Sequence, residues 1–129
     1  MAQHSPGFLA LVEDARRRVR EVTADEVQSR LARGARFHLI DVREDHEWAV
    51  DRVRGAEHLG KGIIERDAEL RFPDKQAELV LYCGGGFRSA LAADALQRMG
   101  YANVLSMAGG IRAWREKGYP LERGSTPAG

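Results

Sequence analysis

Cys83 is the only cysteine in this chain of 129 residues, and it stands where two kinds of sequence meet. The apolar residues before it, 79–82, are typical of a buried strand in a parallel sheet. Three glycines follow it, and then Phe87, Arg88 and a helical pattern that ends at Gly100. A thiol between the carboxyl end of a strand and the start of a helix is well placed to act as a nucleophile.

The loop after Cys83 has the composition of an anion-binding turn. Glycine adopts positive φ angles without strain, so Gly84, Gly85 and Gly86 can turn several backbone N–H groups toward the sulfur. The helix start adds a partial positive charge and Arg88 adds a full one, and both favour the thiolate over the thiol. A lone cysteine after an apolar strand is more often a small buried hydrophobe, but the glycine run and Arg88 favour a reactive sulfur.

The spacing of the residues excludes other uses of a glycine-rich turn. The dinucleotide pattern Gly-x-Gly-x-x-Gly breaks off after Gly86, and the phosphate-loop pattern lacks its closing Gly-Lys-Ser/Thr. A single cysteine allows neither an internal disulfide nor a Cys-x-x-Cys pair. The four histidines show no metal-ligand spacing, so we expect no metal site.

Composition points to one domain of ordinary size. Hydrophobic residues make up 43% of the chain, which is enough to form a core. The net charge is only +1, and the basic run Arg16–Arg18 is interspersed with acidic residues at helical spacing, so we expect no nucleic-acid partner. The sequence shows neither a membrane-length apolar segment nor a signal peptide, so we expect a cytoplasmic protein that does not bind membranes.

Hydrophobic periodicity and turn residues predict alternating helices and strands. We expect helices at residues 8–19, 63–70, 89–99 and 111–117, and a further helix that begins at a capping box at 23–26 and ends at Gly34. We expect strands at 37–41, 56–59, 79–82 and 103–107. Residues 43–48 are expected to form a polar loop or a short helix. Such alternation predicts a parallel sheet with helices on both faces, which binds ligands beyond the carboxyl ends of its strands. The reactive side chains there are Asp41, Arg43, Lys61, Cys83 and Arg88, and we expect them to share one pocket.

Three motifs in this order resemble the single-domain rhodanese-like sulfurtransferases. The strongest is Cys83-Gly-Gly-Gly-Phe-Arg-Ser89, which is similar to the active-site loop of that family. Residues 39–44 with Glu47-Trp48 resemble its first motif, and residues 103–114 with Gly118-Tyr-Pro120 resemble its last. One segment departs from the family pattern: residues 51–56 lack the usual histidine and proline of Gly-His-x-Pro-Gly-Ala.

The resemblance implies an α/β fold made of a single rhodanese-like domain at residues 22–121. An N-terminal helical extension at 1–21 precedes it, and a flexible tail at 122–129 follows. The resemblance also implies that Cys83 takes a sulfane sulfur from a donor, becomes a persulfide and passes the sulfur on without any cofactor. We expect the donor anion to bind Gly84, Gly85, Gly86, Phe87, Arg88 and Ser89, with Lys61 as a second contact. Asp41 and Arg43 are expected to organise the loop, with Asp41 as a candidate ion-pair partner of Arg88.

The partners expected are small sulfur anions or thiols, or a protein that donates or accepts a persulfide. The sequence allows a monomer or a homodimer. Two alternative functions remain at this level. A small phosphatase or arsenate reductase also uses a cysteine thiolate, but the related phosphatases place five residues between cysteine and arginine, where this chain has four. The other alternative is a module that carries persulfide, or binds a partner, without catalysis.

Overall fold

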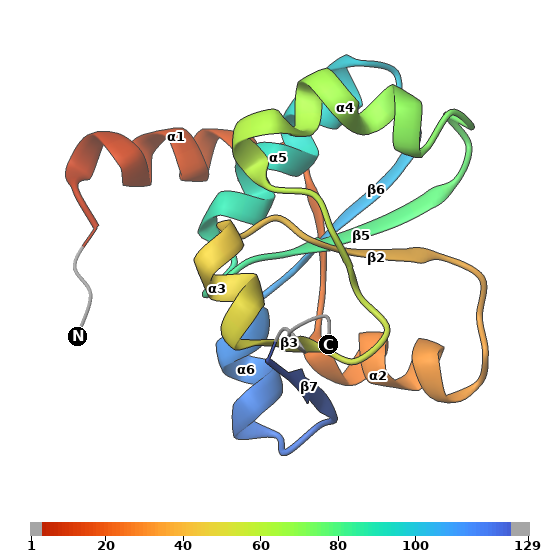
Figure 1. The fold of residues 1–129 in the computed structure, drawn as a ribbon. Coiled ribbons are helices and arrows are strands. Elements are labelled where there is room, and N and C mark those ends of the chain that lie inside the picture. The colour runs from red at the N-terminus through yellow and green to blue at the C-terminus, as the bar shows by residue number, and fades with distance from the viewer. Residues whose placement is uncertain (1–3, 125–129) are drawn as a thin grey trace.

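The structure is a computed structural model that describes residues 4–124 of the chain. Its main sheet has the strand order β1-β6-β5-β2-β4, and all neighbouring strands run parallel (Figure 1). These strands are β1 (Arg20–Val22), β2 (His38–Asp41), β4 (Glu57–His58), β5 (Glu78–Tyr82) and β6 (Asn103–Met107). A small antiparallel sheet pairs β3 (Asp51–Val53) with β7 (Leu121–Arg123).

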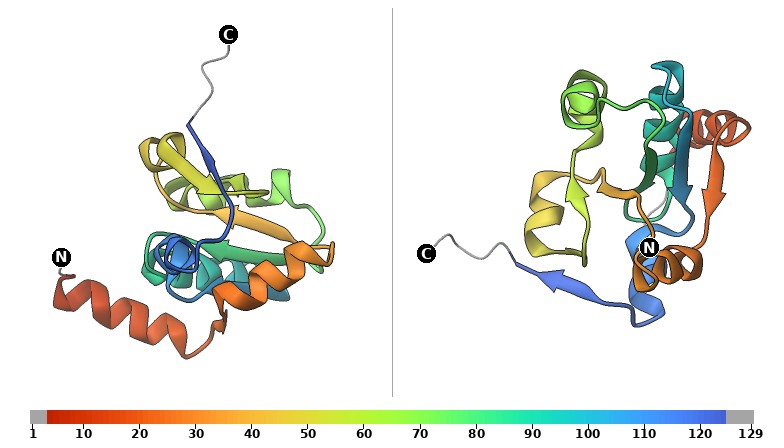
Figure 2. Two further views of the ribbon diagram at one scale, coloured as in Figure 1. Left: turned by 90° about the horizontal axis from the view of Figure 1, so that it is seen from below. Right: turned by 90° about the vertical axis from the view of Figure 1, so that its right-hand side faces the viewer.

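Helices cover both faces of the main sheet (Figure 2). They are α1 (Pro6–Arg16), α2 (Ala24–Ala32), α3 (Asp45–Val50), α4 (Ile64–Arg71), α5 (Phe87–Arg98) and α6 (Gly110–Glu116), with a short 3₁₀ turn, η1 (Lys61–Ile63). None of the helices between residues 4 and 124 has the length and apolar content that a membrane crossing requires.

The central strand β5 divides the core into two clusters because its side chains alternate between the faces. Leu79 and Leu81 pack with side chains of α4 and α5 on one face. Val80 and Tyr82 pack with side chains of α2 and α6 on the other, including Trp114, which is fully buried. Burial on both faces explains why residues 79–82 read as a continuous apolar run.

The predicted α/β fold with a parallel sheet is confirmed, but two predicted boundaries, the end of the first helix and the start of the tail, are wrong. The leading helix ends at Arg16, not at residue 19, because residues 20–22 form β1 at the edge of the sheet. A boundary after residue 21 therefore falls inside a strand of the main sheet. Glu122 and Arg123, expected in a flexible tail, lie in β7, while residues 125–129 of that tail lie outside the described residues.

Two glycine turns bring α5 and α6 together at the carboxyl edge of the sheet. Gly86, with a φ of 96°, caps α5, and Gly110, with a φ of 55°, opens α6. A Cβ on Gly110 would overlap the carbonyl oxygen of Cys83. The backbone N–H of Ile111 donates to that same carbonyl at 2.9 Å. The start of α6 is therefore packed directly on the loop that carries Cys83.

Candidate active site

Cys83 follows the last residue of β5 directly, and its side chain is turned into the loop that leads to α5. The residue is only 1% exposed. Its Sγ accepts a hydrogen bond from the backbone N–H of Gly86 at 3.1 Å and a longer one from that of Ser89 at 3.4 Å. Of the three glycines expected to direct an N–H group at the sulfur, Gly86 does so, and Ser89 supplies the second backbone donor.

A pair of buried hydroxyl groups lies on the inner side of the sulfur. The Oγ of Ser89 is 3.6 Å from Sγ and 2.8 Å from the Oγ of Ser106, and neither serine is exposed. When Ser106 donates to Ser89, the hydroxyl of Ser89 is left to donate to the sulfur. We did not predict a role for Ser106, and the only signal was a polar residue among the otherwise apolar buried residues of β6.

Arg88 pairs with Glu47 of α3, so the prediction that Asp41 is its ion-pair partner is wrong. The two guanidinium nitrogens of Arg88 lie 2.8 and 3.2 Å from the two carboxylate oxygens. Arg88 lowers the pKa of Glu47 to about 2, mainly through these hydrogen bonds. Glu47 also accepts from the backbone N–H of Glu44 in a capping box, which fixes the start of α3. The pair therefore links the cysteine loop to α3.

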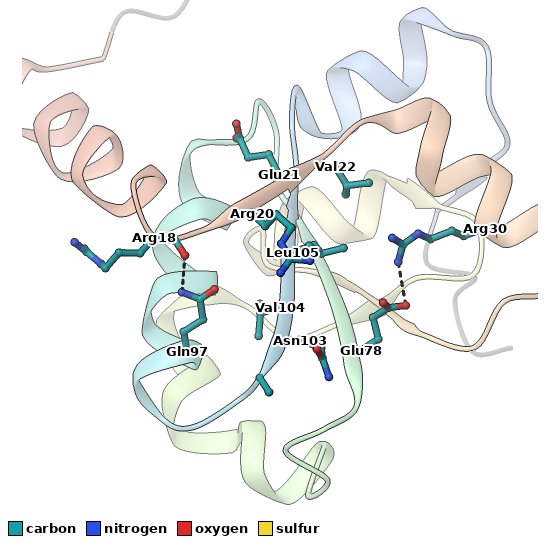
Figure 3. A pocket seen from close by; sticks show the side chains of 11 residues that line it. Arg18, Arg20, Glu21, Val22, Arg30, Glu78, Gln97, Asn103, Val104 and Leu105 are labelled. Atoms are coloured by element: carbon teal, nitrogen blue, oxygen red, sulfur yellow. Dashed lines mark hydrogen bonds and ion pairs between the residues drawn. The ribbon is translucent and has the colours of Figure 1, made fainter.

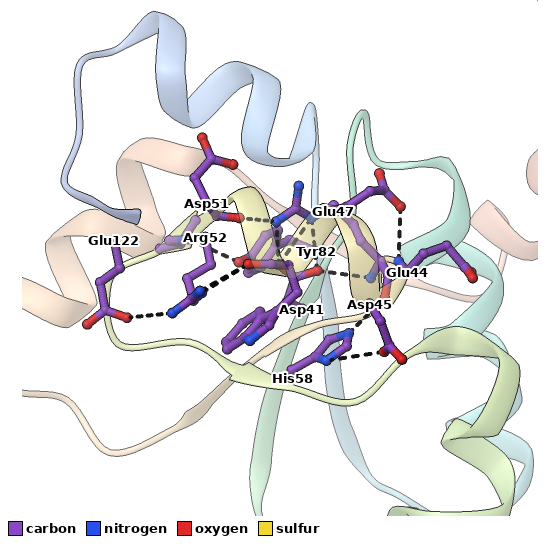
Figure 4. Close-up of polar contacts among 12 residues, drawn as sticks. Asp41, Glu44, Asp45, Glu47, Asp51, Arg52, His58, Tyr82 and Glu122 are labelled. Atoms are coloured by element: carbon purple, nitrogen blue, oxygen red, sulfur yellow. Dashed lines mark hydrogen bonds and ion pairs between the residues drawn. The ribbon is translucent and has the colours of Figure 1, made fainter. Parts of the chain in front are cut away.

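Asp41, which is labelled in Figure 4, instead forms a buried pair with Arg43. Its carboxylate accepts from the backbone N–H and the guanidinium of Arg43 at 2.8 to 3.1 Å. The same guanidinium donates to the backbone carbonyl of Asp51 at 2.6 Å. Asp41 and Arg43 thus connect the end of β2 to the start of β3 and support α3 between them, rather than contacting the sulfur.

The segment that departs from the family pattern is held by ionic contacts of its own. The carboxylate of Asp51 pairs with Arg115 of α6 at 2.6 Å. Arg52 stacks on Trp48 at 4.4 Å and donates to the carbonyl oxygens of Trp48 and Gly124. The expected histidine and proline are therefore replaced by arginine-mediated contacts that position β3.

A cavity of about 610 Å³ opens over the sulfur, and it contains part of the predicted site. The predicted residues that line it are Cys83, Gly84, Gly85, Phe87 and Arg88, while Gly86 and Ser89 lie beneath the sulfur as donors. Of the residues the structure describes, four more line it that we did not predict: His4, Ser5, Phe8 and Arg112. Lys61, expected as a second anion contact, begins η1 and does not line this cavity.

A second cavity, of about 210 Å³, lies near the amino ends of β5 and β6 (Figure 3). It is also rich in arginine, but Arg30 pairs with Glu78 at 2.9 Å, and Arg18 pairs with Asp94 at 2.9 Å. None of the described residues that line it is a cysteine, so the candidate nucleophile lies only in the cavity at the carboxyl edge of the sheet.

His58 has structural contacts: its ring stacks on Trp48, and its Nε2 donates to the carbonyl of Arg43 at 2.9 Å. Within residues 4–124 no three His, Cys, Asp or Glu side chains gather in the way that a metal ion requires.

The fold and the site together define an α/β domain that presents a cysteine on a tight glycine-rich loop. The rhodanese-like domain family matches residues 23–117, and the chain belongs to this family. A sulfurtransferase of Allochromatium vinosum is 34% identical over 80% of this chain and 94% of its own length.

Two further similarities mark the range of related proteins. The probable adenylyltransferase/sulfurtransferase MoeZ of Mycobacterium tuberculosis is 33% identical over 77% of this chain, which spans only a quarter (25%) of that larger protein. A solved structure from Rhodopseudomonas palustris, described as a protein of unknown function and possible tyrosine phosphatase, has a TM-score of 0.81 and 28% identity. The similarity covers 95% of this chain and 99% of that one.

Proposed function

We propose that the protein is a sulfurtransferase in which Cys83 carries the transferred sulfur. The observation that carries this proposal is the environment of the Cys83 sulfur. Two backbone N–H groups at the start of α5 donate to Sγ, and Arg88 lines the cavity that opens over it. Donors of this kind stabilise a thiolate on Sγ, and we propose that the same loop stabilises the persulfide, whose negative charge lies on the outer sulfur. The proposed donors are thiosulfate, polysulfide or glutathione persulfide, and the acceptors are cyanide or a thiol.

In the loading step, the Cys83 thiolate attacks the outer sulfur of the donor. With thiosulfate, a new bond forms between Sγ and that sulfur, the sulfur–sulfur bond of the donor breaks, and its electron pair leaves with sulfite. In the second step the acceptor attacks the outer sulfur of the persulfide, and the electron pair of the broken bond returns to Cys83. Arg88 can hold the anionic donor by charge-assisted hydrogen bonds.

Phosphate or arsenate chemistry is the second candidate function, and the description of the Rhodopseudomonas palustris structure favours its inclusion. The loop argues against it, because only four residues separate Cys83 from Arg88. The backbone donors converge on the sulfur itself, which suits one added sulfur atom better than a tetrahedral oxyanion. Assays with aryl phosphate and arsenate therefore form the comparison arm of the experiment below.

A carrier that passes persulfide between proteins would share the loading step but turn over slowly with small acceptors. A single cysteine cannot form an internal disulfide, which suits a reducing compartment, and we propose the cytoplasm. Repeated turnover with cyanide or a small thiol would distinguish an enzyme from such a carrier.

The test is the intact mass of the protein after incubation with thiosulfate or polysulfide, before and after addition of cyanide or a thiol. We expect wild type to gain one sulfur atom and to lose it to the acceptor. Cys83→Ser should gain none while keeping the circular dichroism and thermal midpoint of a folded protein. No gain by wild type with any sulfane donor, together with phosphate or arsenate turnover, would overturn the proposal.

A further inference from the structure

One wall of the cavity over Cys83 comes from Phe8 of α1 and from His4 and Ser5 just before the helix, outside the residues that match the family. The helix lies beside α5 (Figure 1). His4 meets the ring of Phe87 edge-on at 4.4 Å, and Phe8 meets it at 6.3 Å. The rings of Phe8 and Phe87 form an apolar patch on this side of the cavity, next to the polar side chains of His4 and Ser5.

Three arginine contacts hold this wall in place. Arg16 donates to the carbonyl oxygen of Gly86 at 3.4 Å and lies over the ring of Phe87 at 5.0 Å. Just beyond the helix, Arg18 forms a bidentate pair with Asp94 of α5, with both distances at 2.9 Å. The helix is thus fastened to the cysteine loop and to α5, so the wall is part of the folded site.

Arg112 of α6 supplies a positive charge to the same cavity. A Cβ on Gly85 would lie 3.6 Å from its Nη1, so the guanidinium stands close over the cysteine loop. Arg88 is neutralised by Glu47, but Arg112 has no side-chain hydrogen bond or ion pair with any residue in the described range 4–124. Arg112 is therefore the guanidinium that a ligand can bind without displacing a carboxylate.

An inorganic sulfur anion fills only a small part of a cavity of about 610 Å³, a volume in the range that holds small organic ligands. The cavity combines a reactive sulfur, an apolar wall and a cation without a partner. We propose that α1, Phe87 and Arg112 form the binding site for an organic thiol acceptor that bears a carboxylate. The carboxylate binds Arg112, and the carbon chain lies against Phe8 and Phe87. This inference rests on the proposed sulfurtransferase function.

The transfer that this site serves is balanced. The acceptor thiolate attacks the outer sulfur of the Cys83 persulfide, so a sulfur–sulfur bond forms on the acceptor. The bond between Sγ and the outer sulfur breaks, and its electron pair remains on Sγ as the thiolate. One thiolate and one persulfide anion are consumed and one of each is formed, so no oxidant or reductant takes part.

The test of Arg112 compares two acceptors of similar size, 3-mercaptopropionate and the neutral 2-mercaptoethanol. The protein is first loaded with sulfur, and the rate of discharge is followed by intact mass at concentrations below saturation. Loss of a hydrogen bond to a charged group of this kind lowers binding, and with it the discharge rate below saturation, about tenfold. We therefore expect Arg112→Gln to lower the preference for 3-mercaptopropionate about tenfold. Arg36→Gln, which removes an exposed arginine before β2, is the matched control and should keep the wild-type preference.

The apolar wall is tested with acceptors of different chain length. Since burial of each methylene group is favourable, wild type should discharge to 6-mercaptohexanoate faster than to 3-mercaptopropionate. Phe8→Ala should reduce the ratio of these two discharge rates several-fold. Leu11→Ala, which truncates a side chain of the same helix that is 61% exposed, is the control and should retain it.

The outcomes separate this inference from the proposed function. If wild-type Cys83 takes up no sulfur, the proposed function fails and the acceptor site fails with it. If Cys83 loads and discharges to cyanide, but Arg112→Gln keeps the wild-type thiol preference, the acceptor site alone is overturned. A slower loading from thiosulfate in Arg112→Gln, with an unchanged thiol preference, also overturns it, because Arg112 would then serve the donor.

Discussion

Two arginine–carboxylate pairs stand near the site, and they differ in burial and in origin. Asp41 and Arg43 are two residues apart, and their side chains are 0% and 4% exposed. Glu47 and Arg88 come from different elements, and their side chains are 26% and 30% exposed. The first pair holds the backbone between β2 and β3, whereas the second stands at the mouth of the cavity.

The difference in burial determines what each pair can do. A buried pair cannot open without leaving a charge in the core, which costs several kcal/mol. A pair that is partly exposed contributes only about 0 to 1 kcal/mol, because water replaces the lost contact. Arg88 can therefore turn from Glu47 to an anionic donor at small cost, while Arg43 must stay in place.

The largest effect should follow the loss of Arg43. Arg43→Ala removes the guanidinium from Asp41, and a buried charge without its partner typically costs about 3–5 kcal/mol in the free energy of unfolding. Urea unfolding of wild type and variant measures this loss. The double variant Asp41→Asn with Arg43→Met removes both charges and should recover much of it. A loss below about 1 kcal/mol for Arg43→Ala would remove the contrast between the two pairs.

Loss of Arg88 should affect loading more than folding. Arg88→Ala should lower the free energy of unfolding by no more than about 1 kcal/mol. It should slow sulfur uptake from thiosulfate about tenfold, because charge-assisted hydrogen bonds to the donor are lost. Arg66→Ala, which removes an exposed arginine paired with Asp67, is the matched control. An unchanged loading rate would make the Arg88 pair structural, like the buried one.

The smallest effect is the pH dependence that Glu47 contributes. The folded-state pKa of Glu47 is lowered to about 2 from its usual 4.5, so its contribution to stability is present above pH 4.5. That contribution declines as the pH falls below 4.5 and is lost as the pH falls through about 2. Glu47→Gln should therefore be less stable than wild type at pH 7, by less than about 1 kcal/mol, and nearly equal to it near pH 2. Urea midpoints at the two pH values measure this, and a gap that does not shrink in acid would contradict the assignment.

The cysteine loop could be predicted because its parts are contiguous. Strand, glycines, Arg88 and helix follow one another, so local rules suffice. The partner of Arg88 could not be predicted, because Glu47 is distant in sequence and reaches the loop only once α3 has folded. The same holds for Ser106, Arg112 and Phe8.

The short strands escaped prediction for a different reason. In β1, Arg20 and Glu21 are exposed at the edge of the main sheet, so no apolar alternation marks the strand. In β7 only Leu121 packs against the core, and Glu122 and Arg123 are exposed. Both strands depend on a neighbouring strand for their conformation, and that information lies elsewhere in the chain.

The packing of α6 on the cysteine loop also limits how this site can change in evolution. Gly110 leaves no room for a Cβ above the carbonyl of Cys83, and a Cβ on Gly86 would lie 3.0 Å from the backbone nitrogen of Gly109. An additional residue in the loop would therefore have to displace α6. If Cys83 carries sulfur as proposed, a change to phosphate chemistry would therefore require matched changes in two turns, at residues 84–86 and 109–110.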